Sequence, residues 1–137
     1  MISNASAKAR QTKYCKAVKS ALSRYGHATN SMLLNELRRI FPGLSATTVH
    51  RATARLADRG EIGLAPATKD GSMRYDANLK PHDHFVCSDC DNLLDINVKS
   101  KLLPILESYV ADCQLSGSLT ISGTCKNCIK QIRKERY

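Results

Sequence analysis

The chain of 137 residues contains no Trp, two Phe and five Tyr, so its core must be built mainly from aliphatic side chains. It has no apolar run long enough to span a bilayer, and its first residues lack the apolar stretch of a signal peptide. These absences predict a cytoplasmic protein with no membrane partner. A chain of this length forms one ordinary domain or two small ones, and small domains need a staple or a partner chain.

Excess positive charge is confined to one part of the chain. The net charge is +9, yet residues 1–80 hold 14 Lys and Arg against 5 Asp and Glu, whereas residues 81–137 hold 7 of each kind. A basic module joined to a neutral one is typical of a nucleic-acid reader attached to a second module. A solubilising surface would carry the same charge, so charge alone leaves both interpretations open.

The first part of the chain has the pattern of a winged helix-turn-helix. Helices are expected over 6–25, 31–41 and 46–59, with Thr29 or Asn30 capping the second and Ser45 capping the third. Two short strands flank an Asp-Gly turn, which predicts a hairpin wing. Three helices and a hairpin make a winged helix whose third helix reads DNA, and a small helical bundle is the alternative.

The second part of the chain has a mixed α/β pattern. Pro81 marks an expected hinge at residues 79–82, between a first domain at 1–78 and a second at 83–137. The second domain is expected to contain strands near 84–87, 93–98 and 114–123, a helix over 98–113 and a short basic C-terminal helix. We expect Pro104 in the first turn of its longer helix. The whole chain is therefore predicted to be α+β.

Four of the six cysteines form two Cys-x-x-Cys pairs that are separated by 34 residues. Four thiolates in this spacing predict a structural, tetrahedral Zn(II) site that has no open position: Cys87, Cys90, Cys125 and Cys128. Such a site would tie the C-terminal tail to the first strands of the second domain. Redox dithiols or free thiols are the alternative. Cys15 and Cys113 have no partner at metal spacing, so we expect them to be small buried residues.

A second set of candidate ligands lies beside the hinge. His82 and His84 are two residues apart in an expected strand, so their side chains should share one face and Asp83 should point to the other. Asp76 ends the wing and Asp95 follows one strand later. Nitrogen and oxygen donors of this kind suit Fe(II), Mn(II) or Zn(II). Each residue alone could also be an ordinary surface or hinge residue.

Three stretches of the chain resemble the ferric uptake regulator family. They are "LSATTVHRATARLADRGEI", "RYDANLKPHDHFVCSDCDNLLDI" and "ISGTCKNC", and the resemblance covers roughly residues 8 to 129. It implies an N-terminal winged-helix DNA-binding domain followed by a small α/β dimerisation domain with a four-cysteine zinc site. It also implies a homodimer that binds a palindromic, A/T-rich operator in double-stranded DNA as a metal-dependent repressor.

Within the family, the chain is most similar to the peroxide-sensing branch. The resemblance implies a regulatory Fe(II) or Mn(II) held by His27, Asp76, His82, His84 and Asp95. It implies that peroxide oxidises His27 and His82 when Fe(II) is bound, which releases the metal and then the DNA. The iron-sensing branch usually has Glu at the position of Asp95. The family's additional dimer-domain site is incomplete, because Gly117 replaces a usual His, so we expect one regulatory metal per chain.

The expected DNA contacts follow from the winged-helix interpretation. Phosphate contacts are expected from Lys8, Arg10, Lys13, Lys16, Lys69 and Arg74, and base contacts from Thr47, Thr48, His50 and Arg51. The solvated-surface alternative applies to each lysine separately. His50 replaces the usual Tyr of the family, and Cys15 stands where the family commonly has a DNA-contacting Arg, so base preference is expected to differ.

Three other functions fit part of the pattern. An iron, manganese or zinc uptake regulator of the same family would use the hinge metal without oxidising histidine. A non-haem metalloenzyme would use a His/His/Asp set to activate oxygen, but the second domain is too small to enclose a sizeable cavity. A zinc-ribbon nucleic-acid binder would have an incidental histidine pair. The regulator is the preferred interpretation, and no enzymatic activity is expected.

Overall fold

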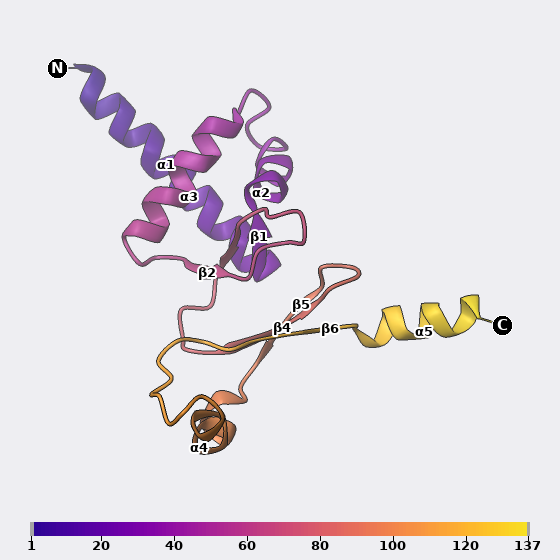
Figure 1. The fold of residues 1–137 in the computed structure, drawn as a ribbon. Helices are drawn as coiled ribbons and strands as arrows, with labels where there is room; N and C mark the ends of the chain where they lie inside the picture. The colour runs from indigo at the N-terminus through magenta and orange to yellow at the C-terminus, as the bar shows by residue number, and fades with distance from the viewer. Residues whose placement is uncertain (1, 137) are drawn as a thin grey trace. The chain divides into compact units, whose positions relative to one another are not determined.

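The computed structural model describes residues 2–136, and their side chains from residue 12 onward. The chain divides into two compact units, Met1–Leu79 and Lys80–Tyr137, which are described separately (Figure 1). The boundary lies inside the segment 79–82 that the sequence indicates as a hinge. Among the described residues, no helix combines the length and the apolar character needed to cross a membrane.

The first unit contains three helices, and the second and third start where the capping signals in the sequence predict. They are α1 (Ile2–Tyr25), α2 (Asn30–Leu37) and α3 (Ala46–Asp58). The Thr29 hydroxyl accepts the backbone N–H of Met32 at 3.2 Å, and Ser45 accepts that of Thr48 at 3.2 Å. Both therefore satisfy amides that have no partner inside their helices. Aliphatic residues of all three helices form the core, and those at most 1% exposed are Val18, Ala21, Leu22, Leu33, Leu37, Val49 and Leu56.

A three-stranded sheet completes the first unit. Its strands are β1 (His27–Thr29), β2 (Gly63–Ala65) and β3 (Arg74–Asp76), in the order β1-β3-β2. The antiparallel pair β2–β3 is the hairpin wing that the sequence predicts. Strand β1 was not expected, because three residues are too few to show a period. It is possible because Gly26 adopts a positive φ of 80° directly before it.

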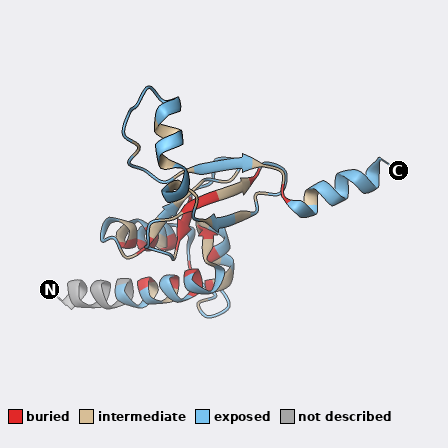
Figure 2. Ribbon diagram, turned by 90° about the horizontal axis from the view of Figure 1, so that it is seen from below, coloured by how far each residue is buried: buried red, intermediate tan, exposed pale blue. Residues whose placement is uncertain are grey.

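The second unit contains another three-stranded sheet and two helices. Strand β4 (Asp83–Cys87) pairs antiparallel with β5 (Leu93–Ile96) and parallel with β6 (Thr120–Gly123). Helix α4 (Lys99–Tyr109) lies in the connection from β5 to β6, and α5 (Lys126–Glu135) follows β6. Neither helix contains a buried residue, and Figure 2 shows both mainly in the colour of exposed surface.

Three details of the second unit differ from expectation. Pro104 lies in the second turn of α4, not the first, because the helix begins at Lys99. The last strand begins at Thr120 and is much shorter than 114–123. Cys113 is exposed and lies shortly after α4, where Ala111 and Asp112 have positive φ values. Cys15 is buried as expected.

The buried carboxylate of Asp83 holds the second unit together. It accepts the backbone N–H groups of Val98 at 3.0 Å, Lys99 at 2.9 Å and Leu119 at 2.9 Å. These bonds join the start of β4 to the start of α4 and to the segment before β6. The N–H donors, led by Leu119, lower the pKa of Asp83. Because α4 has no side-chain cap of its own, Asp83 serves as its cap.

We expect Asp83→Asn to destabilise the second unit by roughly 2 kcal/mol above pH 5, since it removes charge-assisted hydrogen bonds. The folded pKa of Asp83 is lowered, so its contribution is present above the unfolded pKa of about 3.9 and disappears as pH falls through the lower folded pKa. Urea unfolding from pH 7 to pH 2 measures both effects. Asp112→Asn, an exposed change in the same unit, is the control. Equal stability of the two variants at pH 7 would contradict this role.

Candidate metal centres and DNA-binding surface

The four cysteines of the two Cys-x-x-Cys pairs form one cluster within the second unit, called here the thiol cluster. Cys87 ends β4, Cys90 lies in the following turn, and Cys125 and Cys128 lie at the start of α5. The Sγ atoms of Cys87 and Cys128 are 3.9 Å apart, and those of Cys90 and Cys125 are 3.7 Å apart. Four sulfurs at about 2.3 Å from one Zn(II) would be about 3.8 Å apart. The cluster therefore has the dimensions of a tetrahedral zinc site.

Backbone N–H donors favour the thiolate form of one cysteine in the cluster, which is the form that binds a cation. The N–H of Cys125 donates to the Cys87 sulfur at 3.3 Å. This bond, with one from the Cys90 N–H, lowers the pKa of Cys87 to about 6. Hydrogen bonds with the Cys125 and Cys90 thiols raise the pKa of Cys128 to about 12, since a second thiolate would lie against the first. A divalent cation would remove that repulsion and allow all four thiols to ionise.

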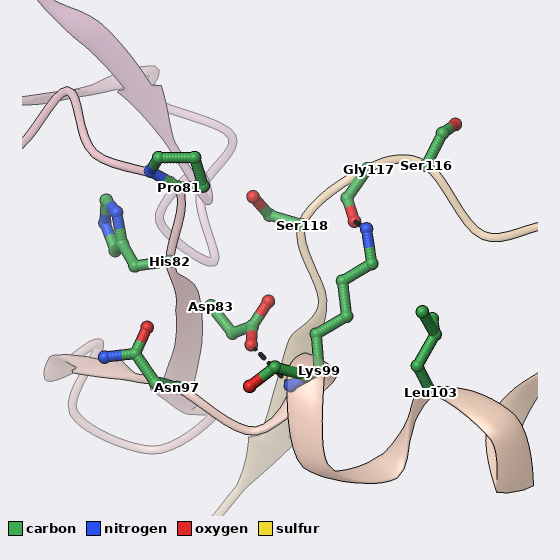
Figure 3. A pocket seen from close by; sticks show the side chains of 10 residues that line it. Pro81, His82, Asp83, Asn97, Lys99, Leu103, Ser116, Gly117 and Ser118 are labelled. Carbon is green, nitrogen blue, oxygen red and sulfur yellow. Dashed lines mark hydrogen bonds between the residues drawn. The ribbon is translucent and has the colours of Figure 1, made fainter.

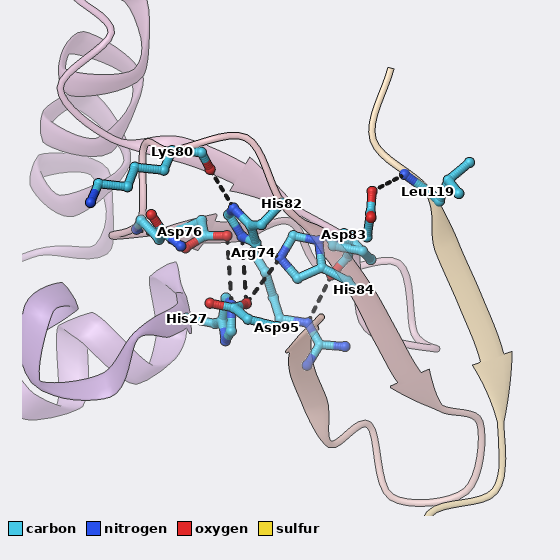
Figure 4. Close-up of polar contacts among 11 residues, drawn as sticks. His27, Arg74, Asp76, Lys80, His82, Asp83, His84, Asp95 and Leu119 are labelled. Atoms are coloured by element: carbon cyan, nitrogen blue, oxygen red, sulfur yellow. Dashed lines mark hydrogen bonds and ion pairs between the residues drawn. The ribbon is translucent and has the colours of Figure 1, made fainter. Parts of the chain in front are cut away.

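Two histidines and an aspartate of the second unit form the His-Asp triangle: His82, His84 and Asp95 (Figure 4). The two Nε2 atoms are 3.0 Å apart, and Asp95 Oδ1 lies 3.5 Å from that of His82 and 3.4 Å from that of His84. Strand pairing produces this arrangement, because His84 lies opposite Asp95 in the β4–β5 register. Ligands about 2.1 Å from one ion are about 3.0 Å apart at right angles and about 3.4 Å apart in a tetrahedron. The triangle thus fits three donors of one metal ion.

Backbone contact sets the tautomer of His82. Its Nδ1 lies 2.6 Å from the carbonyl oxygen of Lys80, which has no proton to give, so Nδ1 must be the donor (Figure 4). In neutral imidazole the other nitrogen, Nε2, then carries the lone pair. That lone pair faces the triangle. His82 is therefore oriented as a metal ligand by the backbone just before it.

A second His-Asp pair lies in the first unit. His27 and Asp76 face each other across β1 and β3, with Nε2 3.6 Å from Oδ2. Asp76 is 1% exposed, and its other oxygen accepts the backbone N–H of Asn78 at 2.9 Å. The unexpected strand β1 thus brings His27 beside Asp76. The sequence signal for this pairing was only the resemblance, because neither residue is near the other along the chain.

Asp83 belongs to neither group of possible metal ligands among the described residues. Its carboxylate points away from His84, as the alternation of β4 predicts. It borders a cavity of about 390 Å³ that Asn97, Lys99 and Gly117 also line (Figure 3). The Lys99 ammonium donates to the carbonyl oxygen of Gly117 at 2.8 Å. The ammonium group of Lys99 therefore lies on the face of β4 to which Asp83 points.

The expected base-contacting residues lie on the exposed side of α3 or close to it. Thr47, His50 and Arg51 are exposed and Thr48 is half-buried. His50 Nδ1 lies 3.2 Å from the amide nitrogen of Asn30, which connects the start of α2 to the reader helix. Lys16 and Lys69 are exposed, whereas the side chains of Lys8 and Arg10 lie outside the described residues. The ammonium of Lys13 lies over the Phe41 ring, 4.7 Å from its centre.

Arg74 was expected to contact phosphate, and its environment contradicts this. It is 7% exposed, and its guanidinium donates to the carbonyl oxygens of Pro66 at 2.8 Å and Ala67 at 3.4 Å. These bonds join the first residue of β3 to the loop that follows β2. Sequence reasoning missed this role because a basic residue in a wing is usually exposed. Arg74 is therefore a structural residue of the first unit.

The chain combines a winged helix with a small α/β unit that contains a thiol cluster and a His-Asp triangle. This combination is typical of metal-responsive DNA-binding regulators. A family model described as the ferric uptake regulator family matches residues 6–112, which is most of the chain. The chain belongs to this family. The match ends before the second cysteine pair, so the structure, and not the family match, brings all four cysteines together.

The chain is also similar to individual proteins of this family. The peroxide-responsive repressor PerR of Staphylococcus epidermidis is 27% identical over 109 residues, which cover 78% of this chain and 72% of that protein. The ferric uptake regulator Fur of Helicobacter pylori has a similar fold, with a TM-score of 0.71, 22% identity and coverage of 85% and 80%. A peroxide stress regulator of Campylobacter jejuni has a TM-score of 0.70, 23% identity and coverage of 90% and 94%. The two solved structures support the fold assignment.

We expect Cys125→Ser to lose the tightly bound zinc and to unfold the second unit, because three thiolates cannot close the cage. Elemental analysis after mild chelation should find about one Zn(II) per native chain. Acid should release this zinc, since protons compete for the thiolates. Cys113→Ser is the matched control, because Cys113 lies outside the thiol cluster. A zinc content that Cys125→Ser leaves unchanged would contradict the site.

Proposed function

We propose that this protein is a metal-dependent transcriptional repressor that senses hydrogen peroxide. The observation that carries the proposal is the presence of nitrogen and oxygen donors that are separate from the thiol cluster. His27 and Asp76 form one such set in the first unit, and the His-Asp triangle forms another in the second. Chemically, these donors suit Fe(II) or Mn(II), whereas thiolates suit Zn(II).

Both sets are proposed to bind the same ion. The triangle provides three ligands and the His27–Asp76 pair provides two, and neither set alone fills the positions that Fe(II) or Mn(II) usually takes. Asp76 supports this role because one oxygen is fixed by Asn78 and the other is directed at His27. An ion held by both units would fix the DNA-binding unit relative to the second unit. Binding would then depend on the metal through a two-state element.

The chain is proposed to bind a palindromic operator as a homodimer, in the cytoplasm where such DNA is accessible. Exposed apolar residues of the second unit support self-association: Leu94, Leu102, Ile105 and Ile121 are each at least 40% exposed. An apolar surface of this kind is costly unless a partner covers it. A dimer would present two copies of α3 to two half-sites.

Loss of the metal is proposed to follow histidine oxidation. Bound Fe(II) would activate hydrogen peroxide next to its ligands: one peroxide oxygen would be added to an imidazole ring, which gives up two electrons, and the other would leave as water. His27 and His82 are the proposed targets, and an added oxygen would weaken either imidazole as a ligand. His82 supports this role because its Nε2 already faces the other donors of the triangle. Mn(II) would fill the same positions without this damage.

A regulator of iron, manganese or zinc uptake is the second candidate. It would use the same ligands but would respond to metal concentration and not to peroxide. Asp95 at the triangle favours the peroxide sensor, because the resembling iron-sensing proteins usually have Glu there. An oxygen-activating enzyme is a more distant alternative, for which the His-Asp triangle is the only support among the described residues.

Peroxide should abolish DNA binding only when Fe(II) is bound. The Fe(II)-loaded chain would be treated with dilute peroxide and tested on an operator selected from random DNA with the Mn(II)-loaded chain. We expect binding to be lost and peptide mass spectrometry to find one added oxygen on His27 or His82. Mn(II)-loaded protein and the exposed His50 of the same sample are the controls.

Two results would separate the candidate functions. If DNA binding survives peroxide and neither histidine is oxidised, the peroxide sensor is wrong but a metal-uptake regulator remains. If neither Fe(II) nor Mn(II) changes operator affinity, regulation by this metal is wrong as well. These outcomes need no knowledge of the genes that the operator controls.

The exposed residues of α3 and the wing should affect DNA binding in different ways. Arg51→Ala should cost about 1–3 kcal/mol and relax the preference at one base position, because it removes contacts to a base edge. Lys69→Ala should weaken binding to all sequences and reduce the salt slope by about 1, because it removes a phosphate contact. Fluorescence titrations at several salt concentrations measure both. Equal losses on every sequence for Arg51→Ala would show that it does not read bases.

A further inference from the structure

Four cations gather around a cleft of the first unit, between α1 and α3. The cleft has a volume of about 290 Å³, and we call it the α1–α3 cleft. Lys16 and Lys19 line it from α1, and Arg55 and Arg59 line it from α3 and its C-cap. The two lysines are one helical turn apart, and so are the two arginines, so each pair lies on the side of its helix that faces the cleft. The buried thiol of Cys15 also lines this cleft.

The charge of the cleft is not balanced within the described part of the chain. Glu61 is the one acidic residue in its lining, and it pairs with Lys19 at 3.2 Å. No ion pair is recorded for Lys16, Arg55 or Arg59 within the described residues. Three cations around one small space repel one another, and an anion between them would remove that repulsion.

We propose that the α1–α3 cleft is a binding site for a phosphate-class oxyanion. Guanidinium groups from α3 would provide paired N–H donors, and the ammonium groups of α1 would provide point charges on the opposite side. A volume of about 290 Å³ is at the lower limit for ligand pockets, which suits one or two phosphate groups better than a nucleotide. The site goes beyond the proposed metal sensing, because none of its residues is a proposed metal ligand.

Helix stability alone does not account for this arrangement. A cation near the C-terminus of α3 interacts favourably with the helix dipole, which explains one of the two arginines. It does not explain Lys16 and Lys19, which lie in the interior of α1 and face the same cleft. Lys16, Arg55 and Arg59, which have no ion-pair partner among the described residues, repel one another, and a bound anion would offset that repulsion.

Cys15 provides a reporter of occupancy. In the zinc-loaded full chain, the neutral reagent iodoacetamide would be used to alkylate Cys15, with exposed Cys113 as the internal control. At twice its Kd, inorganic phosphate should slow modification of Cys15 about threefold relative to chloride at equal ionic strength. Cys113 should react at an unchanged rate. Peptide mass spectrometry measures both rates in one sample.

A pair of charge-matched variants tests whether the arginines hold the anion. Arg55→Gln with Arg59→Gln should remove the protection of Cys15 by phosphate. Lys130→Gln with Lys134→Gln removes the same charge from α5 and should keep the protection. Circular dichroism of both variants checks that each is folded. Protection that persists in the arginine variant would overturn the proposal.

The phosphate could be a free anion or part of a DNA backbone. Comparing the protection of Cys15 by inorganic phosphate with that by operator DNA distinguishes the two. Protection by inorganic phosphate without DNA would identify a free anion. Protection by operator DNA alone, together with a salt slope reduced by about 2 in the arginine variant, would identify backbone phosphates. If neither phosphate nor DNA protects Cys15 more than chloride does, the cleft is not an oxyanion site. This outcome would leave the proposed peroxide response unaffected.

Discussion

Three backbone N–H groups donate to the carboxylate of Asp83, and the arrangement of the second unit depends on these hydrogen bonds. They hold β4 against the start of α4 and the approach to β6. Strand β4 carries His84 among its five residues and ends at Cys87, while His82 directly precedes it. One short strand therefore contributes to both the His-Asp triangle and the thiol cluster. Because adjacent residues point to opposite faces, Asp83 can anchor the strand while the histidines remain available to a metal.

The chemical difference between the two donor groups gives them different tasks. The thiol cluster has four soft donors at tetrahedral spacing and leaves no position for a reactant. The triangle has nitrogen and oxygen donors, and such sites retain exchangeable positions. Zinc in the first would stabilise a unit whose two helices contain no buried residues. That stability is needed if the triangle is to gain and lose its metal without unfolding.

Local signals in the sequence were sufficient to predict most of the helices and strands. The caps at Thr29 and Ser45, the Asp-Gly hairpin and the two Cys-x-x-Cys pairs each depend on residues close together in the chain. Features that depend on distant contacts were missed. Strand β1 exists because β3 pairs with it, and Arg74 is buried because the wing folds over it. Helix α4 begins at Lys99 because Asp83 of β4 caps it, and this start places Pro104 in the second turn of the helix. The α1–α3 cleft could not be foreseen, because Lys16 and Arg55, which line it from different helices, lie far apart in the sequence.

We propose that one regulatory ion binds both the His27–Asp76 pair and the His-Asp triangle. Calorimetric titration of the zinc-loaded chain with Mn(II) tests it most directly, in native protein and in the His27→Ala and His84→Ala variants. We expect one Mn(II) per native chain, with affinity strongly reduced by either single variant. The double variant should be little worse than each single one, since both substitutions affect the same ion. Two independent Mn(II) ions, each lost in only one of the single variants, would contradict it.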